Sequence, residues 1–280
     1  MENGGKKVYV ITDMEGVAGI NGWHECRPAP DGSAVDYERS RRLLSDEVAA
    51  LVLGARDGGA GDVVVLDGHR SGDNFIAERL PAGGRYVMGR KRPNPLDGLD
   101  GTFDGVILLG YHSMAGTPNG LLAHTMSPGT WKRFSVNGIT LGEIGMMALI
   151  AGSYGVPVWL VTGGRLACDE ARALLSPELR TLAVKEDVAH ESSITMAPEE
   201  ARRMIRRTVA EVVAEPPPVR PFMIDPPWTA SLELVSREVA DAQAVPPSLR
   251  IDDVTFSATI DSIDALLPRC WATARPAAPE

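Results

Sequence analysis

Three apolar stretches of the chain each end in side chains that bind metal ions in many proteins. The stretches span residues 8–12, 63–66 and 106–109, and the polar residues that follow are Asp13 and Glu15, Asp67 and His69, and His112. Two of these sets have i, i+2 spacing, which places both side chains on one side of an extended segment. Carboxylates and imidazoles together are ligands of Zn²⁺, and of Mn²⁺ or Co²⁺ at similar geometry.

Asp13 and Glu15 are the most informative pair, because two neighbouring carboxylates repel each other unless a cation or a shared proton lies between them. The alternative is that Asp13 caps a helix and Glu15 lies on the surface. Glu143 has a similar alternative, since an acidic residue in the first turn of a helix is stabilising without any site. His124 follows a glycine-containing loop, residues 116–120.

Considered together, these residues predict a metal centre with two ions. The candidate ligands are Asp13, Glu15, His69, His112 and Glu143, with Asp67 and His124 nearby. One ion takes three or four protein ligands, so five imply two ions that share a carboxylate. Such a pair activates a water and polarises the bond that the water attacks. His24 and His190 lie in polar surroundings and are interpreted as solvated, although His24 with Cys26 is a weaker zinc alternative.

The elements that must position these residues alternate between strand and helix. The predicted helices span residues 37–56, 142–153, 167–175 and 198–213, and a further strand spans residues 157–161. Continuous apolar strands separated by helices indicate an α/β fold, with a mostly parallel sheet and helices on both faces. In such sheets the ligand crevice lies at the carboxyl ends of the strands, where the polar residues occur. Asn137-Gly138 predicts a hairpin between residues 132–136 and 139–141.

The segment Glu215-Pro216-Pro217-Pro218 cannot continue a helix and marks a predicted domain boundary. We therefore expect a metal-binding α/β catalytic domain over residues 1–215. A small C-terminal α+β domain follows over residues 216–280, with a strand near residues 253–258 and a helix near residues 263–267.

The amino-acid composition limits the classes of partner and the cellular location that we expect for this protein. The 280-residue chain has a formal net charge of −9, which disfavours a nucleic-acid partner and favours cations. Three cysteines without Cys-x-x-Cys spacing predict a reducing, cytoplasmic location. Residues 144–164 carry no charge, but Gly152, Gly155 and Pro157 interrupt them, which indicates a buried helix and strand in place of a membrane span.

Several motifs, in this order, resemble the M55 metallopeptidase family of D-aminopeptidases over nearly the whole chain. They are Asp13-Met14-Glu15-Gly16, Tyr37-Glu38-Arg39, Asp67-Gly68-His69, Gly110-Tyr111-His112, Thr117-Pro118, His124-Thr125-Met126, Gly142-Glu143-Ile144-Gly145 and Val156-Pro157-Val158. The resemblance implies a two-zinc peptidase that releases N-terminal D-amino acids from short peptides. It also implies a homo-oligomer, a ring-shaped decamer with internal active sites.

The resemblance also implies residue roles. Asp13 would bridge the metals, and Glu15, His69, His112 and Glu143 would complete their coordination. His124 matches the family's catalytic histidine, described as a nucleophile. Chemistry favours a general base or a stabiliser of the tetrahedral intermediate instead, because a metal-activated water is already available. Asp67 is interpreted as orienting His69 or another ligand from behind.

The chain departs from the family pattern at some positions around this set. Gly163-Gly164-Arg165 stands where family members commonly have Gly-Asp-Asp, and Met147 stands where they have Asn. The loss of two acids and the gain of Arg165 favour an anionic or acylated substrate group over a free ammonium.

Three further functions are compatible with the sequence. A related amide hydrolase could act on an acidic or acylated small molecule in a biosynthetic pathway. Asp13-x-Glu15-Gly16 also resembles the opening of haloacid-dehalogenase-type, Mg²⁺-dependent phosphatases, but Gly163-Gly164-Arg165 lacks the acidic pair that they need. A metal-stabilised assembly without enzymatic activity is the third, although a carboxylate-rich set is unusual for structural zinc.

Overall fold

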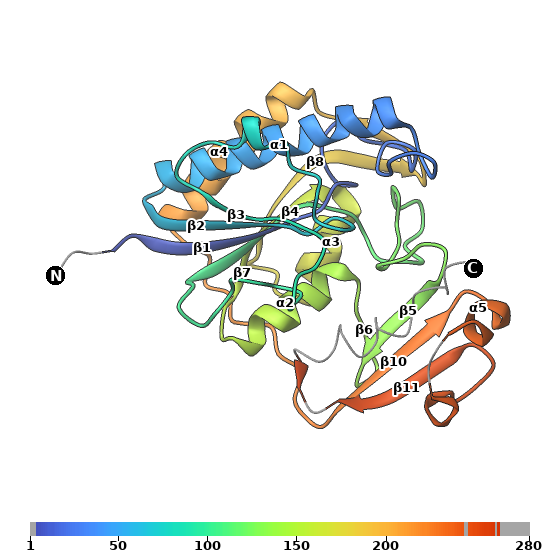
Figure 1. Ribbon diagram of the computed structural model, residues 1–280. Coiled ribbons are helices and arrows are strands. Elements are labelled where there is room, and N and C mark those ends of the chain that lie inside the picture. The colour runs from blue at the N-terminus through green and yellow to red at the C-terminus, as the bar shows by residue number, and fades with distance from the viewer. Residues whose placement is uncertain (1–3, 244–245, 261, 264–280) are drawn as a thin grey trace.

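A seven-stranded, mostly parallel sheet forms the centre of the computed structural model, which describes residues 4–243, 246–260 and 262–263 (Figure 1). Its strand order is β3-β2-β1-β4-β7-β8-β9, and only the pairing of β8 with β9 is antiparallel. The strands are β1 (Lys6–Thr12), β2 (Ala60–Asp67), β3 (Arg85–Val87), β4 (Gly105–Tyr111), β7 (Val158–Gly164), β8 (Arg180–Ala189) and β9 (Ser192–Thr195).

Helices cover both faces of this sheet, because its central strands are apolar on both sides. Helices α1 (Ala34–Asp57) and α4 (Pro198–Ala214) pack side by side on one face (Figure 1). Helices α2 (Glu143–Ser153) and α3 (Arg165–Leu174) contribute to the core on the other face. Neighbouring residues of β1 alternate between the two cores, with Val10 in the first and Ile11 in the second.

A second, antiparallel sheet has the order β11-β10-β5-β6. Its strands are β5 (Trp131–Val136), β6 (Ile139–Thr140), β10 (Trp228–Leu234) and β11 (Thr255–Ile260); the short helices are α5 (Arg237–Asp241), η1 (Ala77–Arg79) and η2 (Pro247–Leu249). The sheet draws strands from both sides of residue 215, and the division into two domains there stays a prediction. The expected hairpin at Asn137-Gly138 forms, with both residues at positive φ.

The predicted fold class is confirmed, and most predicted elements are present within a few residues of their expected bounds. Strands β3, β8, β9 and β10 were not predicted. Strand β8 carries Lys185, Glu186 and Asp187 in succession, so its sequence lacks the continuous apolar run that marked the other strands. The helix expected near residues 263–267 lies outside the described residues, except for its first residue. Within the described part of the chain, no helix is both long and apolar enough to cross a bilayer.

Close backbone packing joins the ends of β1 and β4, where the chemistry-bearing residues lie. The Asp13 amide donates to the Leu109 carbonyl at 2.8 Å, and the Gly16 amide donates to the Gly110 carbonyl at 2.8 Å. A β-carbon at Gly16 would lie 2.1 Å from the Tyr111 carbonyl oxygen, and Gly110 has φ +78°. Glycine is therefore required at both positions, since any side chain would force the two strand ends apart.

Candidate active site

The first half of the site is built from Asp13 and Glu15 after β1 and His69 after β2. The Nδ1 atom of His69 lies 2.9 Å from Asp13 Oδ1 and 3.2 Å from Glu15 Oε2. All three side chains are buried. The i, i+2 carboxylates therefore converge on one imidazole, as their spacing predicted.

The second half centres on His112, which follows β4. Its Nε2 atom lies 3.2 Å from Asp13 Oδ2 and 3.4 Å from Glu143 Oε1. The His124 ring stacks on the His112 ring with a centroid distance of 4.0 Å, and its Nε2 lies 3.6 Å from Glu143 Oε1. Asp13 thus lies between the two halves, with one carboxylate oxygen near each of two imidazoles.

Hydrogen bonds to main-chain carbonyls define which nitrogen of each imidazole faces the carboxylates. His69 Nε2 donates to the Cys26 carbonyl at 2.9 Å, His112 Nδ1 to the Ser113 carbonyl at 2.9 Å, and His124 Nδ1 to the Leu122 carbonyl at 2.8 Å. Because a carbonyl only accepts, each of these nitrogens carries a proton. In the neutral imidazoles the opposite nitrogens then present lone pairs toward carboxylate oxygens.

This arrangement fits metal ions. Asp13 Oδ2, Glu15 Oε2 and His112 Nε2 are fully buried and form no hydrogen bond among the described residues. Buried polar atoms without partners are costly, and lone pairs that face each other repel, so a cation between them satisfies both demands. Two sets have ligand atoms within 4.8 Å of one another: Asp13, Glu15 and His112, and His112, His124 and Glu143. His124 therefore lies at ligand distance, which its position in the sequence did not predict.

The protonation states of the site depend on burial and on the neighbouring charged groups. Burial opposes charge on His69 and His112, yet the neighbouring carboxylates raise the pKa of both imidazoles well above the usual value. Burial also opposes charge on Asp13 and Glu143, and the neighbouring imidazoles lower the pKa of both carboxyls. A divalent cation would replace the imidazole protons, because metal ligands bind in their deprotonated forms.

Surrounding contacts hold the ligands in place. Among the described hydrogen bonds, none joins Asp67 to the His69 ring; Asp67 accepts from the amide and side chain of Asn74, at 2.6 and 2.7 Å. The Asn74 side chain also donates to the His69 carbonyl at 2.6 Å, so Asp67 positions the His69 backbone through Asn74. Buried Lys185 donates to the Glu15 carbonyl at 3.0 Å. Glu143 opens α2 and accepts from the Met126 amide at 2.6 Å.

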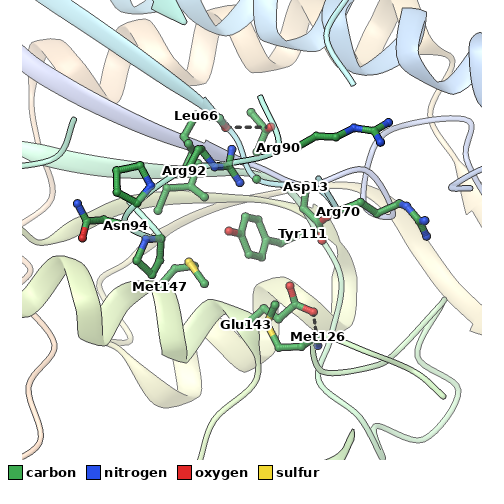
Figure 2. A pocket seen from close by; sticks show the side chains of 15 residues that line it. Asp13, Leu66, Arg70, Arg90, Arg92, Asn94, Tyr111, Met126, Glu143 and Met147 are labelled. Carbon is green, nitrogen blue, oxygen red and sulfur yellow. Dashed lines mark hydrogen bonds between the residues drawn. The ribbon is translucent and has the colours of Figure 1, made fainter. Parts of the chain in front are cut away.

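Two cavities adjoin this centre, and Asp13 and Glu143 line both. The smaller, of about 150 Å³, also contacts Glu15, His69 and His124. The larger, of about 370 Å³, extends past Tyr111 (Figure 2). Together they provide room for a small molecule beside the Asp13 and Glu143 carboxylates.

Arg165, Met147 and His24 were singled out in the sequence, and their positions relative to the two cavities differ. Arg165, at the start of α3, pairs with Glu186 at 2.9 Å and is not among the described residues that line the two cavities. Met147, in contrast, lines the larger cavity. His24 is exposed and lies 3.9 Å from Asp36, as expected for a solvated histidine.

Several residues that surround the centre were not predicted from the sequence. Trp23 contacts the His124 ring edge-on at 5.0 Å and donates from its indole to His190 at 3.2 Å. Arg70 directly follows the Asp67-Gly68-His69 motif, and Asn74 lies four residues further along the chain. Their proximity to that motif was the available signal, whereas nothing in the sequence connects Trp23 to His124.

The fold and the site together define a metallohydrolase, with a buried carboxylate and imidazole centre at the carboxyl ends of a parallel sheet. Comparison with known proteins gives the family. The profile of the M55 peptidases, described as D-aminopeptidase, matches residues 6–270. This chain belongs to the M55 peptidase family.

Individual relatives agree with that assignment. The chain is 30% identical over 266 residues to the D-aminopeptidase of Bacillus subtilis (strain 168), covering 93% of each protein. The solved structure of the Zn-dependent D-aminopeptidase DppA from Bacillus subtilis, described as a self-compartmentalizing protease, superposes with a TM-score of 0.81. That comparison covers 94% of this chain and 95% of the other, at 28% identity.

Proposed function

We propose that this protein is a two-zinc aminopeptidase that releases N-terminal D-amino acids from short peptides. Membership of the M55 family supports the zinc-dependent D-aminopeptidase activity. The proposal of two ions depends on the position of Asp13. Its Oδ1 lies 2.9 Å from His69 Nδ1, and its Oδ2 lies 3.2 Å from His112 Nε2. One carboxylate that faces two separate imidazoles suits a bridging ligand.

In this proposal the ligands are Asp13, Glu15, His69, His112 and Glu143, with Asp13 as the bridge. Zinc bound there would supply a Lewis acid for the scissile carbonyl and a water activated for attack. Asp67 would keep His69 in position through Asn74, because it fixes the backbone of that loop.

We assign His124 the role of a proton-transfer group. Its Nδ1 donates a hydrogen bond to the Leu122 carbonyl, so Nε2 carries the free lone pair. Nε2 lies 3.6 Å from Glu143 Oε1. Burial, with a contribution from His112, lowers the pKa of His124. The imidazole is therefore neutral near pH 7 and able to accept a proton from the attacking water and pass it to the leaving amine.

Self-compartmentalization of the relative supports a homo-oligomer here as well, and we propose the ring-shaped decamer that the family resemblance implies. Sedimentation velocity tests this directly, because a monomer of this chain and a decamer differ tenfold in mass. A single monomeric species at micromolar concentration would contradict it.

One preparation tests the activity. After zinc loading, mass spectrometry should find about two zinc ions per chain, and D-alanyl-D-alanine should be hydrolysed in preference to L-alanyl-L-alanine. Zinc without turnover of any peptide would favour a metal-stabilised assembly. Magnesium-dependent release of phosphate from a phosphate ester would favour the phosphatase alternative.

A further inference from the structure

Three arginines line the larger cavity, and the proposed chemistry uses none of them. They are Arg70, which follows β2, and Arg90 and Arg92, which follow β3. In Figure 2, Arg90 and Arg92 lie above Tyr111 and Glu143 lies below it, whereas Arg70 lies to the right with its side chain extended away from the tyrosine. In a chain of net charge −9, this is a local concentration of positive charge beside the reaction centre.

The three guanidinium groups differ in how far they are neutralised. Arg90 pairs with Asp73 through two nitrogens, at 2.9 and 2.5 Å. Arg92 donates to the main-chain carbonyl of Asp67, which uses one of its five N–H donors and leaves its charge unbalanced. Among the described residues, neither Arg92 nor Arg70 has a carboxylate within 4.0 Å.

The cavity itself does not balance these charges. The carboxylates among its described lining residues are Asp13 and Glu143, which face the imidazoles of the metal centre. Arg70 lines both cavities and has φ +48°, a conformation that is uncommon for a residue with a side chain. Such conformations are concentrated at binding sites, where the surrounding structure enforces them.

We propose that Arg70 and Arg92 bind a carboxylate group of the substrate in the larger cavity. This inference rests on the proposed function, since a peptide with its scissile amide at Asp13 and Glu143 must extend into one of the two adjoining cavities. Guanidinium groups bind carboxylates through paired, charge-assisted hydrogen bonds. The carboxylate is either the C-terminal group of a dipeptide or an acidic side chain.

Three substrates distinguish these sources: D-alanyl-D-alanine, its C-terminal amide, and D-glutamyl-D-alaninamide. We expect the zinc enzyme to favour at least one carboxylate-bearing compound over the amide by about tenfold or more in kcat/KM. The replacements Arg70→Met and Arg92→Met should remove most of that preference, so that each variant hydrolyses the carboxylate compounds and the amide with similar kcat/KM. Lys91→Met is the matched control, because Lys91 is exposed in the same segment and does not line the cavity.

A binding measurement separates this inference from the peptidase proposal. The test uses reduced-amide analogues of D-alanyl-D-alanine, D-alanyl-D-alaninamide and D-glutamyl-D-alaninamide. These analogues lack the carbonyl that water would attack, so calorimetry on the zinc-loaded protein reports binding alone. Absence of hydrolysis would overturn the proposed function, and tighter binding of a carboxylate analogue, lost in both arginine variants, would still support the subsite. Equal binding of all three analogues, or a preference that survives both replacements, would overturn the subsite.

Discussion

Replacing His124 with alanine separates the two roles that the structure allows for this residue. His124 lies at ligand distance from His112 and Glu143, yet its free Nε2 also suits a general base. We expect the His124→Ala variant to retain the zinc content of the wild type and to lose turnover. General acid–base catalysis contributes about 10²- to 10⁴-fold, so kcat/KM should fall by this factor, or about 3–5 kcal/mol in transition-state stabilisation.

The pH profile provides an independent test of the same role. Burial and the neighbouring His112 hold the pKa of His124 below its usual value of 6.5. A base must be unprotonated, so activity that depends on His124 is lost as the pH falls through that lowered pKa. The acidic limb of the kcat/KM profile should therefore lie below pH 6.5 in the wild type, and its midpoint should move or vanish in the variant.

His190→Ala is the control for removing a histidine near Trp23, because His190 accepts from the same indole but is exposed and outside the two cavities. It should retain activity. Full activity in the His124 variant would refute the catalytic role. A drop in zinc content that parallels the drop in turnover would show that His124 is a ligand.

Three further perturbations address the metal centre and its framework. His112→Ala should weaken zinc binding about 100-fold or more, measured by chelator competition, because His112 belongs to both sets of candidate ligands. Gly16→Ala should lower the free energy of unfolding by about 1–3 kcal/mol in denaturant titrations, since its new methyl group would overlap the Tyr111 carbonyl. Gly129→Ala, which meets nothing within 4 Å, should be neutral. Burial raises the pKa of Glu47 to about 7 from 4.5, so its stabilising contribution is complete below pH 4.5 and lost as the pH rises through 7. Glu47→Gln should therefore gain up to about 3 kcal/mol over the wild type between pH 4.5 and 8; a constant difference would contradict the burial argument.

The parallel sheet was predictable because its central strands are buried on both faces. Strands β1, β2 and β4 read as unbroken apolar runs, and their carboxyl ends must lie along one edge of the sheet. Strand β10, in contrast, alternates apolar and polar residues and pairs with β5, almost a hundred residues earlier in the chain. No local pattern specifies a partner at that distance.

The candidate ligands were predictable for a related reason. Asp13, Glu15, His69 and His112 lie just after parallel strands whose carboxyl ends share one edge of the sheet, so local spacing and strand direction together predict that they meet; the structure then places these strands side by side. Arg165 also follows a strand at this edge, but its side chain pairs with Glu186 on the adjacent strand β8. The direction of a long, flexible side chain depends on which charges lie within its reach, and strand order alone does not contain that information.

The sequence by itself determined which kinds of donor atom reach the carboxyl edge of the sheet, because strand length and side-chain alternation are local properties. Tertiary structure decided what those atoms can do. The tautomers of His69, His112 and His124 depend on carbonyls of Cys26, Ser113 and Leu122, which only the folded loops bring into contact. The arginine-lined cavity likewise exists only because the chain after β2 folds back over the metal centre.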